Sequence, residues 1–178
     1  MSAEDRTRWD AAHAERGAMS APALPAVFGD HEELFPHTGS ALEIACGSGA
    51  AAVWLAQRGL DVHGVDVSAV AIDRAHALAE RAGVTARFEA VDLDAGLPAG
   101  GSSDVLLCHK FRDSTLYPQM LERLAPGGLL AICVLSEVGA APGRFRAAPG
   151  ELRTAFSMLD EIASGEGDGQ AWLLARCR

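Results

Sequence analysis

The sequence has 178 residues, which is enough for one domain with a substantial core and too short for two ordinary domains. Hydrophobic residues make up 49% of the chain and charged residues 22%, a balance that excludes a disordered chain. The formal net charge of −9 disfavours nucleic acid as a partner and favours a small molecule.

The sequence predicts neither a membrane protein nor a metal site. No apolar stretch is long enough to cross a membrane, and the first residues lack the basic-then-apolar order of a signal peptide. We therefore expect a cytoplasmic protein with no membrane contact. The four cysteines lie far apart, so neither a metal site nor a disulfide framework is expected.

The hydrophobic pattern predicts strands that alternate with helices. A helix over 4–16 and an irregular segment over 17–29 come first. The strands are expected over 41–46, 60–67, 86–91, 103–109 and 129–135, and the helices over 50–58, 69–82 and 115–124. Ser68 is the expected N-cap of the helix over 69–82, and Gly83 is expected to end it. Alternation of this kind predicts a parallel sheet.

The C-terminal part departs from this alternation. After a short helix from Glu151 to about Phe156, two apolar segments, 158–163 and 171–177, flank a turn over 165–169. Strands joined so tightly must be antiparallel. The expected fold is α/β, a Rossmann-like three-layer sandwich whose seven-stranded, mostly parallel sheet ends in an antiparallel hairpin. We expect a single domain over 1–178, with an N-terminal helix and flap over 1–40 and the Rossmann-like core over 41–178.

A glycine-rich loop follows the first strand of this core. Gly47 and Gly49 stand between a strand and a helix, where a nucleotide-like ligand can approach backbone N–H groups without meeting a Cβ. Residues 47–52 also match a loose G-x-G-x-x-A pattern, so a nicotinamide-dependent oxidoreductase is an alternative. A tight turn without a ligand is the structural alternative.

Acidic residues end the next two strands. Asp66 is placed to accept hydrogen bonds from both hydroxyls of a ribose, although it would serve equally to cap the following helix. Asp92 is placed to accept from an adenine amino group, with Leu93 packed on the ring and Asp94 as the alternative acid. A ligand is therefore expected across the carboxyl ends of these strands.

These residues resemble the class I S-adenosylmethionine-dependent methyltransferases, from Leu42 to the end of the chain. The run LEIACGSG at 42–49 looks like the first motif of that superfamily, GVDVS at 64–68 like its ribose-binding acid, and LAPGG at 124–128 like the turn before its fifth strand. One departure is Ala45, where the family usually has glycine. Among small bacterial-type members, the chain is similar in size to tellurite-resistance and thiopurine methyltransferase-like proteins.

The resemblance implies S-adenosylmethionine as cofactor, S-adenosylhomocysteine as product and methyl transfer as the reaction. It implies that Glu43 orients the methionine end and that Asp66 holds the ribose. The full set of cofactor-binding residues that it implies is Glu43, Ala45, Gly47, Gly49, Asp66, Val67, Asp92, Leu93, Cys108 and His109.

The residues that are candidates for contact with the methyl acceptor indicate less about function. His109, after the fourth strand, is a candidate general base, with simple packing against the cofactor as the alternative. Arg144 and Arg146 are candidates for an anionic acceptor, or side chains of a solvated loop. Trp9 and His13 are candidates for a lid, or for simple docking of the first helix. We expect a small-molecule acceptor, with a cofactor-binding protein without catalysis as another alternative; the oligomeric state has no sequence signal.

Overall fold

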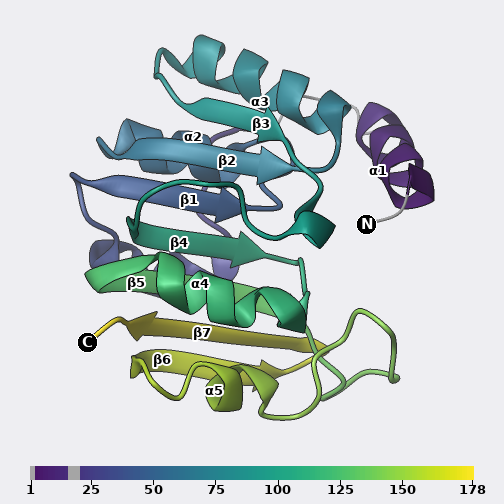
Figure 1. Cartoon of the computed structure of the whole chain (residues 1–178), viewed down its shortest axis with the longest axis vertical. Helices are drawn as coiled ribbons and strands as arrows, with labels where there is room; N and C mark the ends of the chain where they lie inside the picture. The colour runs from purple at the N-terminus through teal and green to yellow at the C-terminus, as the bar shows by residue number, and fades with distance from the viewer. Residues whose placement is uncertain (1–2, 16–20) are drawn as a thin grey trace. The chain divides into compact units, whose positions relative to one another are not determined.

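The computed structural model describes residues 3–15 and 21–178 of the chain. Seven strands form a sheet with the order β3-β2-β1-β4-β5-β7-β6 (Figure 1). The strands are β1 Ser40–Ile44, β2 Asp61–Asp66, β3 Arg87–Ala90, β4 Ser103–His109, β5 Leu124–Leu135, β6 Asp160–Gly167 and β7 Gln170–Arg176. The α-helices are α1 Ala3–Glu15, α2 Ala50–Gln57, α3 Ala69–Ala82, α4 Tyr117–Arg123 and α5 Glu151–Ala155, and the short 3-10 helices are η1 Ala26–Leu34, η2 Leu93–Ala95 and η3 Ser114–Leu116. The predicted mostly parallel α/β fold is confirmed.

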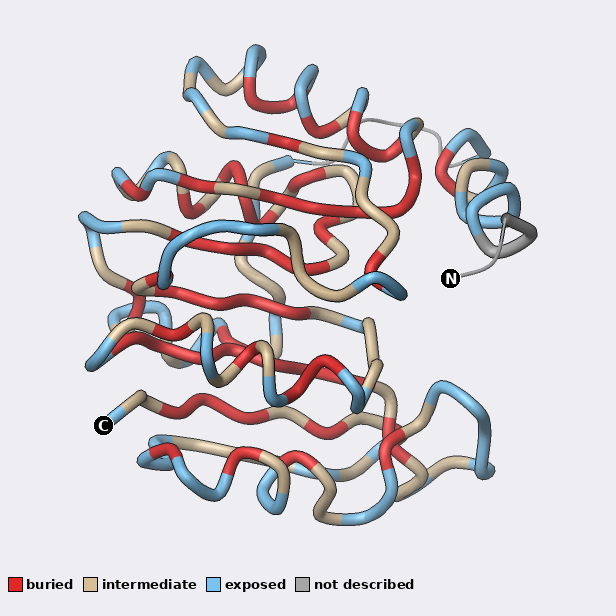
Figure 2. Tube along the Cα trace, in the orientation of Figure 1, coloured by how far each residue is buried: buried red, intermediate tan, exposed pale blue. Residues whose placement is uncertain are grey.

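The chain divides into two compact units, Met1–Ala99 and Gly100–Arg178. In the first unit, β1 pairs with β2 and β2 with β3, all parallel, so these strands end at one edge. Their apolar side chains form the core, and Figure 2 shows β1 and β2 almost continuously buried.

The ends of α3 follow the prediction. Ser68 Oγ accepts a hydrogen bond from the backbone N–H of Ala71 at 3.1 Å, and Gly83 takes the left-handed conformation at φ 69°. An N-cap hydroxyl and a left-handed glycine satisfy polar backbone groups that a helix leaves unpaired at its ends. Both ends of α3 are therefore set by local sequence.

In the second unit, β4 pairs with β5 in parallel, and β7 pairs antiparallel with both β5 and β6. The predicted hairpin is confirmed, but its turn is shorter than the expected 165–169. Only Asp168 and Gly169, at φ 49° and 76°, join the strands. Two residues of positive φ match the twist of a hairpin, and Asp-Gly suits them, so the strands extend further.

Two other expectations were wrong in detail. The fifth strand begins at Leu124, not Leu129, because residues 125–128 form an irregularity within β5 rather than a turn before it. The backbone of Gly127 and Gly128 pairs with Cys177, which keeps this segment in the sheet. In the segment expected to be irregular, η1 begins at Ala26, whereas residues 16–20 lie outside the described part of the chain. Within the described residues, no helix is both long and apolar enough to cross a membrane.

Candidate functional site

The glycine-rich loop turns the chain from β1 into α2 through three left-handed residues. Ala45, Gly47 and Gly49 have φ values of 55°, 52° and 78°. At Gly49, a Cβ would lie 2.7 Å from the Cβ of Ala75, so the loop can pack on α3 only with glycine there. Ala45 is the residue at which the resemblance expects glycine, and its alanine holds a conformation that glycine adopts more easily.

Asp66 connects this loop to the end of β2. Its Oδ2 accepts from the backbone N–H of Gly47 at 2.8 Å, and its Oδ1 accepts from the N–H of Ser68 at 2.9 Å. The helix cap itself is the Ser68 hydroxyl, so Asp66 does more than cap α3. Each carboxylate oxygen can accept a second hydrogen bond. Asp66 thus retains capacity for a ligand hydroxyl.

Glu43 is a buried acid in β1, the strand that leads into the same loop. Its side chain is 4% exposed, and burial raises the pKa of its carboxyl from 4.5 to about 8, with Asp66 adding to the rise and a hydrogen bond from the N–H of Ala52 opposing it. Glu43 is therefore mainly protonated at neutral pH. Among the described residues, Oε2 has no hydrogen-bond partner. An unpartnered buried oxygen is costly unless a ligand or water satisfies it.

The acid after β3 has a local role. Asp92 Oδ1 accepts from the N–H of Asp94 at 3.1 Å and caps η2, while Arg6 of α1 lies 3.9 Å from Oδ2. Leu93 and Val67 are buried, at 2% and 4% exposure. The six predicted residues of β1, β2 and the loops after them, together with Asp92 and Leu93, therefore gather at the carboxyl edge of three parallel strands.

Helix α1 covers part of this edge. The hydroxyl of Ser68 donates to Asp10 Oδ1 at 2.5 Å, and the N–H of Val70 lies 3.5 Å from the same oxygen. His13 is buried, and a Cβ at Gly47 would lie 3.4 Å from its Cε1. Sequence reasoning named His13 but missed Asp10, because one acid among the charges of an exposed helix carries no signal of its partner.

The second unit holds the remaining two predicted residues, at the end of β4. Cys108 is buried, and its thiol donates to the carbonyl oxygen of Phe111 at 3.3 Å. Burial, and to a lesser extent the charge of Lys110, lowers the pKa of His109 from 6.5 to about 4. His109 is therefore neutral at pH 7 and free to accept a proton, although it is a weak base.

Lys110 has an unusual backbone. It is a left-handed residue at φ 62°, and its N–H donates to the carbonyl oxygen of Cys133 on β5 at 2.7 Å. Lysine seldom takes this conformation, and such residues concentrate at functional sites. The side chain is exposed.

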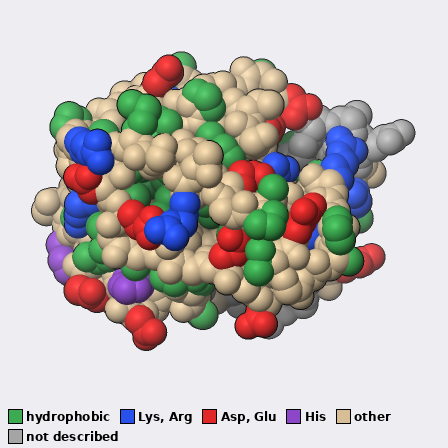
Figure 3. Space-filling view, turned by 90° about the horizontal axis from the view of Figure 1, so that it is seen from below, with side chains coloured by type: hydrophobic (Ala, Val, Ile, Leu, Met, Phe, Trp, Pro, Cys, Tyr) green, Lys and Arg blue, Asp and Glu red, His purple; other side chains and the backbone are tan. Residues whose placement is uncertain are grey.

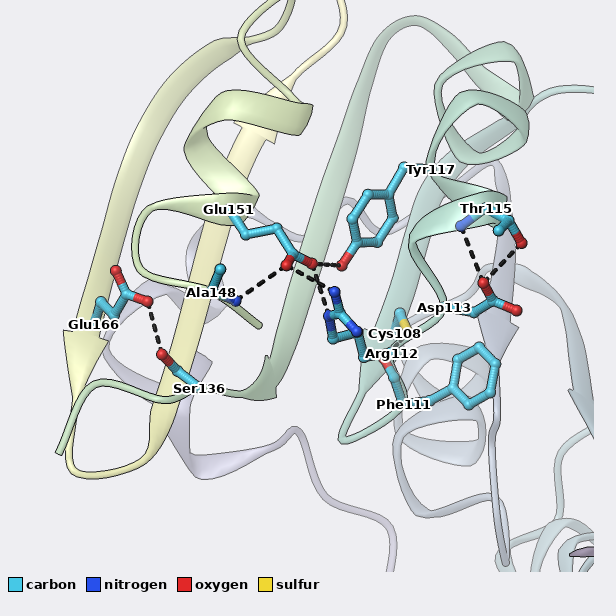
Figure 4. Close-up of polar contacts among 10 residues, drawn as sticks. All are labelled: Cys108, Phe111, Arg112, Asp113, Thr115, Tyr117, Ser136, Ala148, Glu151 and Glu166. Atoms are coloured by element: carbon cyan, nitrogen blue, oxygen red, sulfur yellow. Dashed lines mark hydrogen bonds and ion pairs between the residues drawn. The ribbon is translucent and has the colours of Figure 1, made fainter. Parts of the chain in front are cut away.

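Three polar side chains near this strand end form a network that sequence reasoning missed (Figure 4). Arg112 binds Glu151 with two hydrogen bonds, Nε to Oε1 at 2.7 Å and Nη2 to Oε2 at 2.8 Å. The Tyr117 hydroxyl donates to Oε1 at 2.9 Å, and the N–H of Ala148 donates to Oε2 at 3.1 Å. Glu151 thereby ties the loop after β4 to the loop after β5, and the charge of Arg112 lowers the pKa of the Glu151 carboxyl through these bonds.

The two arginines predicted for an anionic acceptor differ in environment. Arg146 Nη1 donates to the carbonyl oxygens of Ser136 and Gly169, at 2.7 and 3.1 Å. Arg146 therefore holds the loop after β5 against the β6–β7 turn. Arg144 stacks on Phe145, whose side chain is 50% exposed.

Comparison with known proteins agrees with this fold. The model of the methyltransferase domain family matches residues 41–128. Two curated relatives are named "Ribosomal protein L11 methyltransferase": the protein from Dechloromonas aromatica is 37% identical over 51% of this chain and 30% of its own length. The protein from Thermus thermophilus is 32% identical over 70% of this chain and 48% of its own length. The chain thus spans less than half the length of these relatives.

Solved structures share the fold at low identity. TehB from Haemophilus influenzae has a TM-score of 0.77 at 20% identity, over 88% of this chain and 63% of its own. Magnesium protoporphyrin IX methyltransferase from Synechocystis, solved with bound S-adenosylhomocysteine, has a TM-score of 0.65 at 17% identity, over 98% of this chain and 83% of its own. The fold is that of the class I methyltransferases. Residues 41–128 match the methyltransferase domain family, and the comparisons support membership of the S-adenosylmethionine-dependent methyltransferase superfamily.

Proposed function

We propose that this chain binds S-adenosylmethionine within a single domain over 1–178 and transfers its methyl group to a small-molecule acceptor. The observation that carries the cofactor assignment is the unpartnered Oε2 of buried Glu43, beneath a glycine loop that is hydrogen-bonded to Asp66. A buried acid with a free oxygen suits the charged amino group of an amino-acid ligand, and the loop suits a ligand that lies along its backbone.

Each predicted residue has a role in this proposal. Glu43 accepts from the amino group of the methionine end, and Asp66 accepts from the ribose hydroxyls. Ala45, Gly47, Gly49 and Val67 present backbone along the ligand. Asp92 and Leu93 contact the adenine. The bound cofactor supplies a methyl group already activated by a sulfonium, so the protein mainly positions the acceptor.

By the sequence resemblance, Cys108 and His109 at the end of β4 are also assigned to cofactor binding. A neutral His109 accepts a proton from an acceptor that loses one as it is methylated. An acceptor with a soft nucleophile, such as a thiol already ionised, needs no base. The effect of His109→Ala on the methylation rate, measured at saturating S-adenosylmethionine, therefore separates these two acceptor classes.

Charge supports a small acceptor rather than nucleic acid. The chain has a net charge of −9, and in the face that Figure 3 shows, the Lys and Arg side chains occur in small groups among acidic and apolar ones. Nucleic-acid sites are usually broad basic surfaces. The names of the curated relatives favour a second candidate, a ribosomal protein as acceptor.

Calorimetric titration tests the cofactor assignment. Wild-type protein is titrated with S-adenosylmethionine, S-adenosylhomocysteine and NADH. We expect binding of both adenosyl ligands in the micromolar range, on the order of −8 kcal/mol, and marked weakening by Asp66→Ala. Asp73→Ala, an exposed acid on α3, is the matched control. Binding of NADH alone would instead support an oxidoreductase.

A methylation assay tests the acceptor. Formation of S-adenosylhomocysteine is followed with a panel of small thiols, amines, hydroxyls and selenium or tellurium oxyanions, and separately with purified ribosomal proteins. Turnover with a small molecule supports the first candidate, and turnover only with a ribosomal protein supports the second. Binding of cofactor without turnover on any acceptor would support a non-catalytic binding protein.

A further inference from the structure

Helix α1 meets the proposed cofactor site at three separate segments. Asp10 contacts the start of α3, His13 lies against the glycine loop, and Arg6 lies near Asp92 after β3. These three segments are the ones to which we assign the ribose, the methionine end and the adenine.

The contact at Asp10 is the strongest of the three. Its Oδ1 accepts from the Ser68 hydroxyl at 2.5 Å, and the N–H of Val70 lies 3.5 Å away. The carboxylate therefore sits at the N-terminus of α3, a 14-residue helix, where unpaired N–H groups favour a negative charge. A charge-assisted bond of this geometry is about twice as strong as a neutral one. Asp10 thus anchors α1.

The contact at His13 places the anchored helix over the glycine loop. Its Cε1 lies 3.4 Å from the place that a Cβ would take on Gly47. Because glycine has no side chain, a ligand would approach the loop on this side of Gly47. His13 is 4% exposed, so it fills this place rather than projecting into water. A ligand that lies on Gly47 must displace His13.

We propose that α1 is a gate over the cofactor site, that Asp10 is the latch that holds it closed, and that the gate must open before cofactor binds. This inference rests on the proposed function. Asp10 is a positioning residue, because it acts through Ser68 and α1 and is assigned no contact with the cofactor. Its loss should therefore change how fast the cofactor binds.

Stopped-flow binding of S-adenosylhomocysteine tests the gate. In Asp10→Ala we expect the association rate constant to rise by about tenfold, which corresponds to the loss of one hydrogen bond to a charged group. Asp73→Ala, which removes an exposed acid from α3, should leave that constant unchanged. His13→Ala should raise it as well, since it removes the side chain that covers Gly47.

A second measurement shows that the latch itself has been released. Hydrogen exchange of the backbone amides over 8–15 should quicken in Asp10→Ala and not in Asp73→Ala, and thermal melts should show that both variants remain folded. An unchanged association rate in Asp10→Ala and His13→Ala would overturn the gate and leave the proposed function intact. Failure of all the proteins to bind S-adenosylhomocysteine would overturn the proposed function and the gate with it.

Discussion

The N–H of Gly47 donates to Oδ2 of Asp66 at 2.8 Å, and this one bond joins the loop after β1 to the residue that ends β2. Without it, the loop and the acid would be positioned independently by two strands. With it, any ligand that contacts both meets a pair whose spacing is already set. Preorganisation of this kind lowers the entropy lost on binding.

Replacing Ala45 by glycine should stabilise the protein. Ala45 holds φ 55°, which costs an L-residue roughly 1 kcal/mol and costs glycine little. We expect Ala45→Gly to raise the melting temperature by about 2–4 °C. Ala77→Gly, on the exposed face of helix α3, is the control and should lower it, because glycine weakens a helix interior. Equal destabilisation by the two changes would contradict the prediction.

The parts of the fold whose signals are local were predictable. Ser68 and Gly83 set the ends of α3 through their own hydrogen bonds and dihedral angles, and β4 was predicted with its observed bounds. The start of β5 was missed because it depends on pairing of Leu124 with Ser103 and of Gly127 and Gly128 with Cys177, about 50 residues away, which no local pattern encodes. The glycine-rich turn was predicted too long for a similar reason, since pairing across the hairpin extends both strands.

Glu43 should make stability fall as pH rises. The pKa of its carboxyl is about 8 in the folded protein and near 4.5 when unfolded, so between these values the folded state binds more protons. The free energy of unfolding should therefore decrease from about pH 5 to pH 8. The part of this decrease that is due to Glu43 should be up to about 5 kcal/mol. Urea denaturation across this range measures it. Glu43→Gln should remove most of that slope, and an unchanged slope would show that Glu43 is not its source.

Cofactor binding should release a proton from the same residue. A positive amino group beside Glu43 favours the ionised carboxylate and so lowers its pKa. At pH 7, we expect S-adenosylhomocysteine binding to release a proton from wild type and substantially less from Glu43→Gln. Calorimetry in phosphate and in Tris, whose ionisation heats differ, gives the number of protons released. Equal release by the two proteins would place the amino group elsewhere.

His109 should have the opposite effect on stability. Burial lowers its pKa to about 4, whereas the unfolded side chain titrates near 6.5. Between these values the unfolded state binds more protons, so stability is lost as pH falls from about 6.5 towards 4. His109→Gln should flatten this part of the pH profile, measured by urea denaturation. A profile that stays as steep would indicate that other groups cause the acid loss.

The Glu151 network should contribute more to stability than a surface ion pair. Glu151→Ala leaves Arg112, Tyr117 and the N–H of Ala148 without their acceptor, and we expect a loss of about 2–3 kcal/mol. Tyr117→Phe removes one bond and should cost about 1 kcal/mol. Glu161→Ala, which breaks an exposed pair with Arg153, is the control and should cost under about 1 kcal/mol. Urea midpoints compare the three.

The candidate site was predictable only where backbone position implies chemistry. Glycines and acids at strand ends mark the proposed cofactor edge, because parallel strands all end there. Asp10 and Glu151 gave no such signal, since each matters through a partner distant in sequence: Ser68 for Asp10 and Arg112 for Glu151. Side-chain pairs of this kind form only in the folded chain, so the sequence does not predict them.

Lys110 is unusual for a second reason: it is the only lysine in the sequence. Its side chain is exposed immediately after His109, and its backbone is held by Cys133. Apart from the terminal amine, an amine-reactive fluorophore therefore has a single target in this chain. Such a label would report directly on the strand end next to His109, and no residue would have to be replaced to introduce it.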